Sequence, residues 1–207
     1  MAAEEEVLSE RLEKVMEKLG NARVSINEQM GKLPQGGDLS LVAIRADEIR
    51  KAVLDGASVT REVHADYSRI LKELEVNRVR RAKIDEVRNK IVLPLEEIIN
   101  PNFGEFQLAE DASHKFYQAL DEDVTAKRTP NLDAHMANAR QTRDQLEKLM
   151  ARLNDVLIAM GEGIIEARNF ENLVLITRNQ EEITKQFNKY YTDKVGDLLK
   201  SLLPDMK

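Results

Sequence analysis

The side chains of this sequence best suited to metal binding or proton transfer are its three histidines, His64, His114 and His135. A di-iron helical bundle needs inward-facing carboxylates and two Glu-x-x-His motifs, because one metal pair takes its ligands from four helices. The run from Asp111 to His114 (Asp-Ala-Ser-His) comes nearest to this motif, and the sequence holds no second copy. We therefore expect no metal site.

The sequence supports nucleophilic catalysis no better than metal binding. The sequence contains no cysteine, which removes thiol nucleophiles, disulfides and thiolate metal ligands. Ser113 stands beside His114 in the sequence only, and there is no Gly-x-x-x-x-Gly-Lys-Ser/Thr phosphate loop. We predict a protein that is not an enzyme and binds no cofactor. An enzymatic role would require His114 and neighbouring carboxylates to converge in the folded chain.

Positive charge is concentrated in one segment, here called the basic stretch, whose members are Arg78, Arg80, Arg81, Lys83, Arg88 and Lys90. Such a cluster is typical of a phosphate-binding face. An acidic segment at residues 105–123 follows it, and a turn near Pro101 would bring the two together, so we expect their charges to pair within the chain. The net charge of -6 and the pI near 5.3 predict no binding to nucleic acid. Arg80 and Arg81 are candidate contacts for a protein partner.

Aromatic residues gather at two places. Four of them fall between Phe103 and Tyr117, around the expected middle turn, where they would fill a helix end or, alternatively, line a ligand pocket. Tyr190 and Tyr191 are adjacent in the last expected helix, so one of the two rings faces outward. Tyr190 and Tyr191 are the second pair of candidate partner contacts.

Helices must position these candidates, because apolar residues recur at helical spacing along the chain. The clearest case is a ladder in which steps of four and three residues repeat from Val42 to Leu74. This spacing is typical of the narrow seam of a helix packed against another helix. The positions of the ladder are Val42, Ala46, Ile49, Val53, Gly56, Thr60, Val63, Tyr67, Ile70 and Leu74.

Composition indicates an all-α protein, an elongated antiparallel helical bundle with coiled-coil-like hairpins and about five helices. Charged residues make up 33% of the chain and aromatic residues 4%, and there is no tryptophan. We expect a single domain over residues 1–207 with an internal joint near 75–82. Proline and glycine predict helix breaks near 33–38, 100–104, 127–130 and 161–163.

Local signals refine the helix ends. Asp38 or Ser40 is expected to cap the second helix, which Pro94 should kink or interrupt. The third helix is expected from Glu105 to about Ala126. Thr129 is expected to cap the fourth, with Pro130 at its first position, and the last helix to carry apolar residues at 176, 183 and 187. No apolar run approaches 18 residues and no signal-peptide pattern occurs, so we predict no membrane insertion by this segment and leave localisation open.

Residues 153–186 carry a resemblance to other sequences. The segments Leu-Asn-Asp-Val-Leu-Ile-Ala-Met (153–160) and Ile-Thr-Arg-Asn-Gln-Glu-Glu-Ile (176–183), with Phe170 between them, resemble part of very large, uncharacterised, predicted surface or exported helical proteins of planctomycete bacteria. The insert at 161–165 and the few basic residues around it depart from that pattern. The resemblance implies a structural or scaffolding role inside a longer polypeptide and transfers no functional residue.

The sequence favours a noncatalytic helical scaffold or protein–protein interaction domain, which works in a larger assembly or a longer polypeptide and binds a protein partner or itself. The alternative is a small-molecule or lipid carrier, a helical bundle that opens at a hinge at Gly161 to Gly163. Exchangeable lipid-binding bundles usually show wide apolar faces and basic flanks. The narrow seams and acidic balance of this chain therefore favour the interaction domain.

Overall fold

The computed structural model describes residues 7–33, 38–76, 81–126 and 130–202, with side chains described as far as residue 189. Its elements are α1 (Leu8–Gly31), α2 (Leu39–Val76), α3 (Arg81–Val87), the π-helical turn η1 (Arg88–Val92), α4 (Leu93–Ile98), α5 (Glu105–Ala126) and α6 (Leu132–Leu202). No strand occurs in these ranges, which confirms the predicted all-α class. Where one domain was expected, the chain divides into two compact units, Met1–Ile164 and Ile165–Lys207, and α6 contributes to both.

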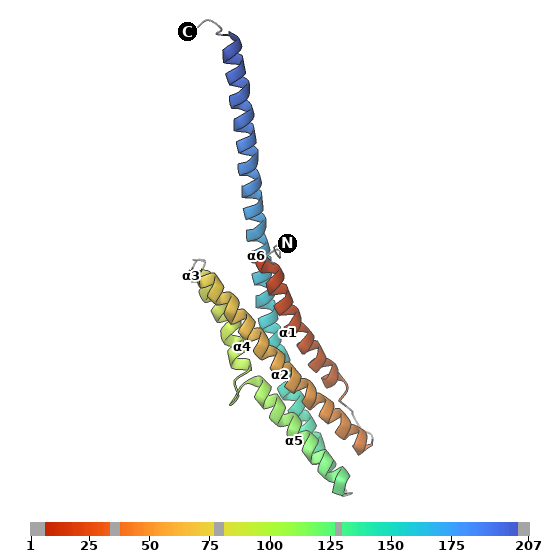
Figure 1. Ribbon diagram of the computed structural model, residues 1–207. Coiled ribbons are helices and arrows are strands. Elements are labelled where there is room, and N and C mark those ends of the chain that lie inside the picture. The colour runs from red at the N-terminus through yellow and green to blue at the C-terminus, as the bar shows by residue number, and fades with distance from the viewer. Residues whose placement is uncertain (1–6, 34–37, 77–80, 127–129, 203–207) are drawn as a thin grey trace. The chain divides into compact units, whose positions relative to one another are not determined.

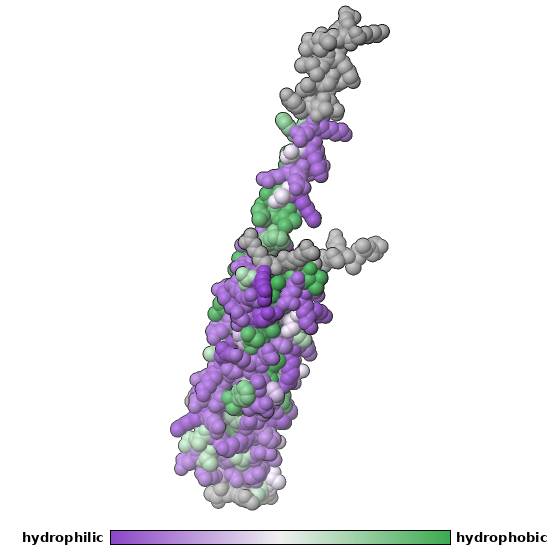
Figure 2. Space-filling view, turned by 90° about the vertical axis from the view of Figure 1, so that its left-hand side faces the viewer, coloured by the Kyte–Doolittle hydropathy of each residue, from purple (hydrophilic) through white to green (hydrophobic). Residues whose placement is uncertain are grey.

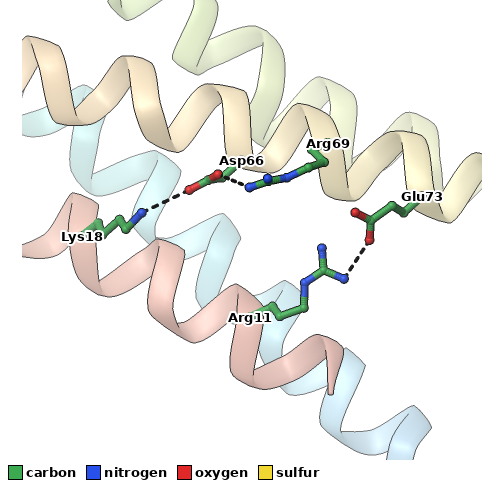
Figure 3. Close-up of polar contacts among 5 residues, drawn as sticks. All are labelled: Arg11, Lys18, Asp66, Arg69 and Glu73. Carbon is green, nitrogen blue, oxygen red and sulfur yellow. Dashed lines mark hydrogen bonds and ion pairs between the residues drawn. The ribbon is translucent and has the colours of Figure 1, made fainter. Parts of the chain in front are cut away.

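In the first unit, α1 lies antiparallel to α2 (Figure 1). Arg11 Nη1 lies 2.7 Å from Glu73 Oε2, and Lys18 Nζ lies 3.3 Å from Asp66 Oδ2, so residue numbers rise along α1 as they fall along α2 (Figure 3). Arg69 also binds Asp66 from within α2. These pairs are partly exposed and each contributes at most about 1 kcal/mol. They show how the two helices are aligned but add little to the stability of that alignment.

The segments α3, η1, α4 and α5 follow one another along α2 and form a third arm antiparallel to it (Figure 1). Three contacts at successive levels show this direction: Arg88 with Glu75, Phe106 with Gly56, and Arg50 with Tyr117. The turn between α4 and α5 therefore continues the arm, and the sequence-based expectation of an antiparallel hairpin at Pro101 is wrong. In this turn, Asn100 Oδ1 accepts a hydrogen bond from Asn102 N, and Asn100 O accepts one from Gly104 N.

The part of α6 within the first unit forms the fourth arm and lies antiparallel to the third. Their contacts, in order along α6, are Asp123 with His135, Ala112 with Thr142, Glu105 with Arg152, and Lys90 with Glu162. Gly161 also lies beside Met16, so α6 reaches α1. The first unit is thus an up-down-up-down bundle of four arms.

One apolar stripe from each arm fills the core. The ladder of α2 is buried from Ala46 to Ile70 and half-buried at its two ends, which confirms it as a packing seam. The largest completely buried residues of the other arms include Leu19, Leu95, Leu120 and Leu153. Removing such a side chain from water contributes about 1.5 to 3 kcal/mol. The bundle is therefore held mainly by these stripes.

Pro94 is accommodated by the widened turn η1, where the sequence predicted a kink or a break. The backbone N–H of Leu93 bonds to the carbonyl of Arg88, five residues earlier, and Pro94 lies in the first turn of α4. Proline lacks an N–H and its ring clashes with the carbonyl four residues before it in a regular helix. The wider turn removes that carbonyl from its usual place, so the chain continues from α3 to α4 in helical form.

Two other expectations about helix ends need correction. The break at 161–163 is wrong, because α6 continues through both glycines; each costs only about 1 kcal/mol relative to alanine, which is too little to end a long helix. Asn131 is the cap of α6, since its Oδ1 accepts a hydrogen bond from Ala134 N at 3.2 Å. Pro130 therefore precedes the helix, and Thr129 lies outside the described residues. Asp38 does cap α2, through Ser40 N at 2.9 Å.

Gly56 is the point at which α1 and α5 both approach α2. A Cβ atom placed on Gly56 would lie 2.6 Å from Ile26 Cδ1 and 3.2 Å from Phe106 Cε1. We expect Gly56→Ala to lower the free energy of unfolding by about 1 to 3 kcal/mol, because overpacking outweighs the gain in helix propensity. Gly20→Ala is the matched control: Gly20 lies inside α1 with open space around its Cα, and the change should raise stability by up to about 1 kcal/mol. Denaturant unfolding followed by circular dichroism measures both, and a stabilised Gly56→Ala would contradict the packing described.

Tyr67 is completely enclosed in the core, yet its hydroxyl has no hydrogen-bond partner among the residues that the structure describes. A buried polar group without a partner loses its bonds to water and gains none. We expect Tyr67→Phe to raise the free energy of unfolding by about 1 kcal/mol, measured in the same way. A clear loss of stability in Tyr67→Phe would show that the hydroxyl has a bonding partner after all.

Candidate interaction surfaces

The described lysines and Arg88 of the basic stretch pair with acidic residues outside 105–123, so the expected pairing with that segment is wrong for them, and Arg78 and Arg80 lie outside the described residues. Lys83 and Lys90 each bind Glu86, and Arg88 binds Glu75 at 2.6 Å. Lys90 also lies 3.7 Å from Glu162 on α6. The reason is topological: because the turn at 100–104 continues the third arm, α5 lies beyond α3 along the same direction and not beside it.

The acidic residues near that turn instead meet an arginine from α6. Arg152 Nη2 lies 2.7 Å from Glu97 Oε2 on α4, and Arg152 Nε lies 3.1 Å from Glu105 Oε1 on α5. One guanidinium thus bridges both sides of the turn. Arg152 thus links the fourth arm to the third.

Glu86 lies between Lys83 and Lys90 of the basic stretch, and its pKa is strongly lowered. Hydrogen bonds from Lys90 and then Lys83 lower the pKa of Glu86 from the ordinary 4.5 to about 2. The carboxylate accepts from Lys83 at 2.9 Å and from Lys90 at 2.8 Å, one turn before it and one turn after it. This arrangement supports the local helix around η1 and leaves the side chain on the surface.

The candidate partner contacts from the sequence fall in different units. Arg81 is exposed at the first position of α3, and Arg80 lies outside the described residues. Tyr190 and Tyr191 lie on α6 in the second unit, where the description covers the helix and not their side chains. No described contact joins Arg81 to a site, so these four residues remain predictions.

The histidines lie in different local environments. His135 is buried, and its Nε2 lies 2.8 Å from Asp123 Oδ2, which ties the start of α6 to the end of α5. His114 is exposed, while the neighbouring Ser113 is buried and donates its hydroxyl to Glu110 O. Over the described ranges, no group of three or more His, Asp or Glu side chains is placed to hold a metal ion.

The second unit exposes an apolar stripe on α6. Leu173, Ile176 and Ile183 are 60%, 52% and 66% exposed, although they stand at the spacing of a packing seam. Gln180 occupies the remaining position, so steps of three, four and three residues join the four, and Phe187 continues the pattern after a further four. We call Leu173, Ile176, Gln180 and Ile183 the α6 stripe. Figure 2 shows hydrophobic side chains among hydrophilic ones along this part of the helix.

Uncharged polar residues flank the α6 stripe on both sides. These flanking residues are Asn172, Thr177, Asn179, Thr184 and Gln186. Thr177 and Thr184 donate their hydroxyls to backbone carbonyls of their own helix, at 2.9 Å and 2.8 Å, and so need no outside partner. The charged residues Arg178, Glu182 and Lys185 fall on other faces of α6. The sequence had indicated the apolar positions of this helix, but it did not reveal their exposure.

Comparison with known protein families, with curated proteins and with solved structures finds no match for this chain. In the described ranges, no helix combines the length and the apolar character needed to cross a membrane.

The Glu86 carboxylate offers a direct test of the local pairing around η1. Because its pKa in the folded chain is lowered, the pairs with Lys83 and Lys90 stabilise the fold above the ordinary glutamate pKa of 4.5, and this effect is lost as the pH falls towards about 2. Lys90→Met should raise the pKa of Glu86, while Lys90→Arg should keep it low. A carboxylate titration by nuclear magnetic resonance measures both. An unchanged pKa in Lys90→Met would show that Lys90 does not bind Glu86.

Proposed function

We propose that this protein is a noncatalytic helical scaffold and protein–protein interaction module. The four-arm bundle of the first unit provides a stable folded body. The α6 stripe of the second unit contacts a protein partner. The observation that carries this proposal is the exposure of Leu173, Ile176 and Ile183 at seam spacing, when residues with that spacing in α2 are buried.

Physical chemistry supports a partner for this surface. A helix without tertiary contacts is marginal in water, because most helical stability in proteins comes from packing of an apolar face. Helical recognition uses anchors three, four and seven residues apart, which is the spacing of the α6 stripe. Each leucine or isoleucine fully covered by a partner would contribute about 1.5 to 3 kcal/mol. Covering the stripe would thus stabilise both the complex and the helix.

The alternative role as a small-molecule or lipid carrier has no described feature in its favour. Its hinge at Gly161 to Gly163 lies inside the continuous helix α6, and a Cβ atom placed on Gly161 would lie 3.8 Å from Met16 Cε of α1. The resemblance of residues 153–186 to large surface proteins of planctomycete bacteria agrees with a scaffolding role and stays a prediction.

An interaction surface should be dispensable for the fold of the body that carries it. We expect the double variant Ile176→Gln/Ile183→Gln to leave hydrogen exchange of the α2 and α5 amides unchanged, because the α6 stripe is not part of the bundle core. Hydrogen exchange followed by mass spectrometry resolves these helices separately. Leu175→Gln is the matched control, because Leu175 is 58% exposed and lies next to Ile176 but off the stripe. If only the double variant speeds exchange in α2 and α5, the stripe is a structural element of the bundle and the proposal fails.

A further inference from the structure

We propose that the partner of the α6 stripe is a second copy of this chain, and that the two stripes pair as a parallel, in-register two-helix coiled coil. This inference rests on the proposed function and specifies its partner. Leu173, Ile176, Gln180 and Ile183 then occupy alternating seam positions of a heptad repeat. Each position faces the same residue of the other copy.

The uncharged flanks are the first argument for self-pairing. In two-stranded coiled coils, the residues beside the seam are often charged, and these charges decide which helices pair. Here the seam is flanked by Asn172, Thr177, Asn179, Thr184 and Gln186. Two identical copies therefore meet without like-charge repulsion, and the flanks offer no charge that would select a different helix.

The charged residues nearby do not oppose this arrangement. Arg178, Glu182 and Lys185 lie on faces of α6 away from the seam, and Gln186 donates to Glu182 along the helix at 3.2 Å. Thr177 and Thr184 bind their hydroxyls to their own backbone, so the flanks can approach a second helix without breaking an outside hydrogen bond. The positions that touch in a two-helix coiled coil thus carry neither net charge nor an unsatisfied hydroxyl.

Gln180 is the second argument, and it selects the parallel orientation. A glutamine amide both donates and accepts hydrogen bonds. In a parallel, in-register pair, Gln180 faces Gln180 of the other copy, and the two amides satisfy each other. In an antiparallel pair, the layers match Gln180 with Ile176 or Ile183, and the amide is buried without a partner. A single polar residue at such a position is a known determinant of register and orientation in coiled coils.

The absence of cysteine from the sequence makes a clean test possible. In the full-length chain, Leu173→Cys places one thiol on the seam and keeps Gln180, and Arg178→Cys places one on another face. In a parallel, in-register pair, two thiols at 173 fall within disulfide reach, which requires Cα atoms at most about 7 Å apart. In a glutathione buffer, Leu173→Cys should form disulfide-linked dimers at least about tenfold faster than Arg178→Cys, because the seam raises the local thiol concentration.

A non-covalent measurement guards against an effect of the cysteine itself. Light scattering coupled to size-exclusion chromatography should show a dimer whose fraction rises with concentration for the unmodified chain and for Leu175→Gln. Ile176→Gln/Ile183→Gln should shift the chain to monomer at the same concentrations. Equal linking rates at 173 and 178 would overturn the parallel seam, as would linking only between Leu173→Cys and Ile183→Cys chains in a mixture, which marks the antiparallel pair in which Gln180 faces Ile176.

The two proposals fail in distinguishable ways. A chain that stays monomeric at all concentrations, with bundle exchange unaffected by Ile176→Gln/Ile183→Gln, overturns self-pairing and leaves the stripe as a surface for a different protein. Loss of bundle protection in that double variant overturns both, since the stripe would then belong to the core.

Discussion

The fold of the first unit depends on the close contact of three arms at Gly56. Ile26 of α1 and Phe106 of α5 both fit against α2 where a side chain would stand, so both neighbours are held at one level of α2. The other contacts between the arms lie at corresponding positions further along them. Arg11 of α1 pairs with Glu73 of α2, and Arg88 of the third arm pairs with Glu75 of α2. Shape, rather than charge, thus sets the register, because exposed ion pairs are weak and a steric conflict in a packed core is not.

The sequence predicted the parts of this fold that depend on local pattern. The ladder of α2 is the seam of that helix, α5 runs from Glu105 to Ala126 as expected, and Asp38 caps α2. Local pattern could not decide the direction of the chain after Asn100, because a turn that reverses an arm and a turn that continues it use the same proline and glycine. The charge pairing inferred from a reversal was wrong for that reason. The helix break expected at Gly161 and Gly163 is absent because a long packed helix tolerates two glycines.

The candidate interaction surface was only partly visible in the sequence. Ile176 and Ile183 were recognised as apolar positions of the last helix, yet the same spacing in α2 marks a buried seam. Exposure is a property of the folded chain, and it distinguishes the apolar positions of α6 at 176 and 183 from the buried seam of α2. The role of Gln180 emerges only when its position is read together with its apolar neighbours. The four partner contacts chosen from charge and aromatic character do not form a described site.

The enclosed Tyr67 also makes the bundle sensitive to alkali. Burial raises the pKa of the Tyr67 hydroxyl well above the usual 10, so the folded chain holds this proton when the unfolded chain has released it. The resulting stability is fully present below the ordinary tyrosine pKa and declines as the pH rises above it, because ionisation favours the unfolded state. The sequence has four tyrosines and no tryptophan. The tyrosinate absorbance of Tyr67 should therefore appear together with unfolding, which makes this residue an intrinsic optical reporter of the integrity of the core.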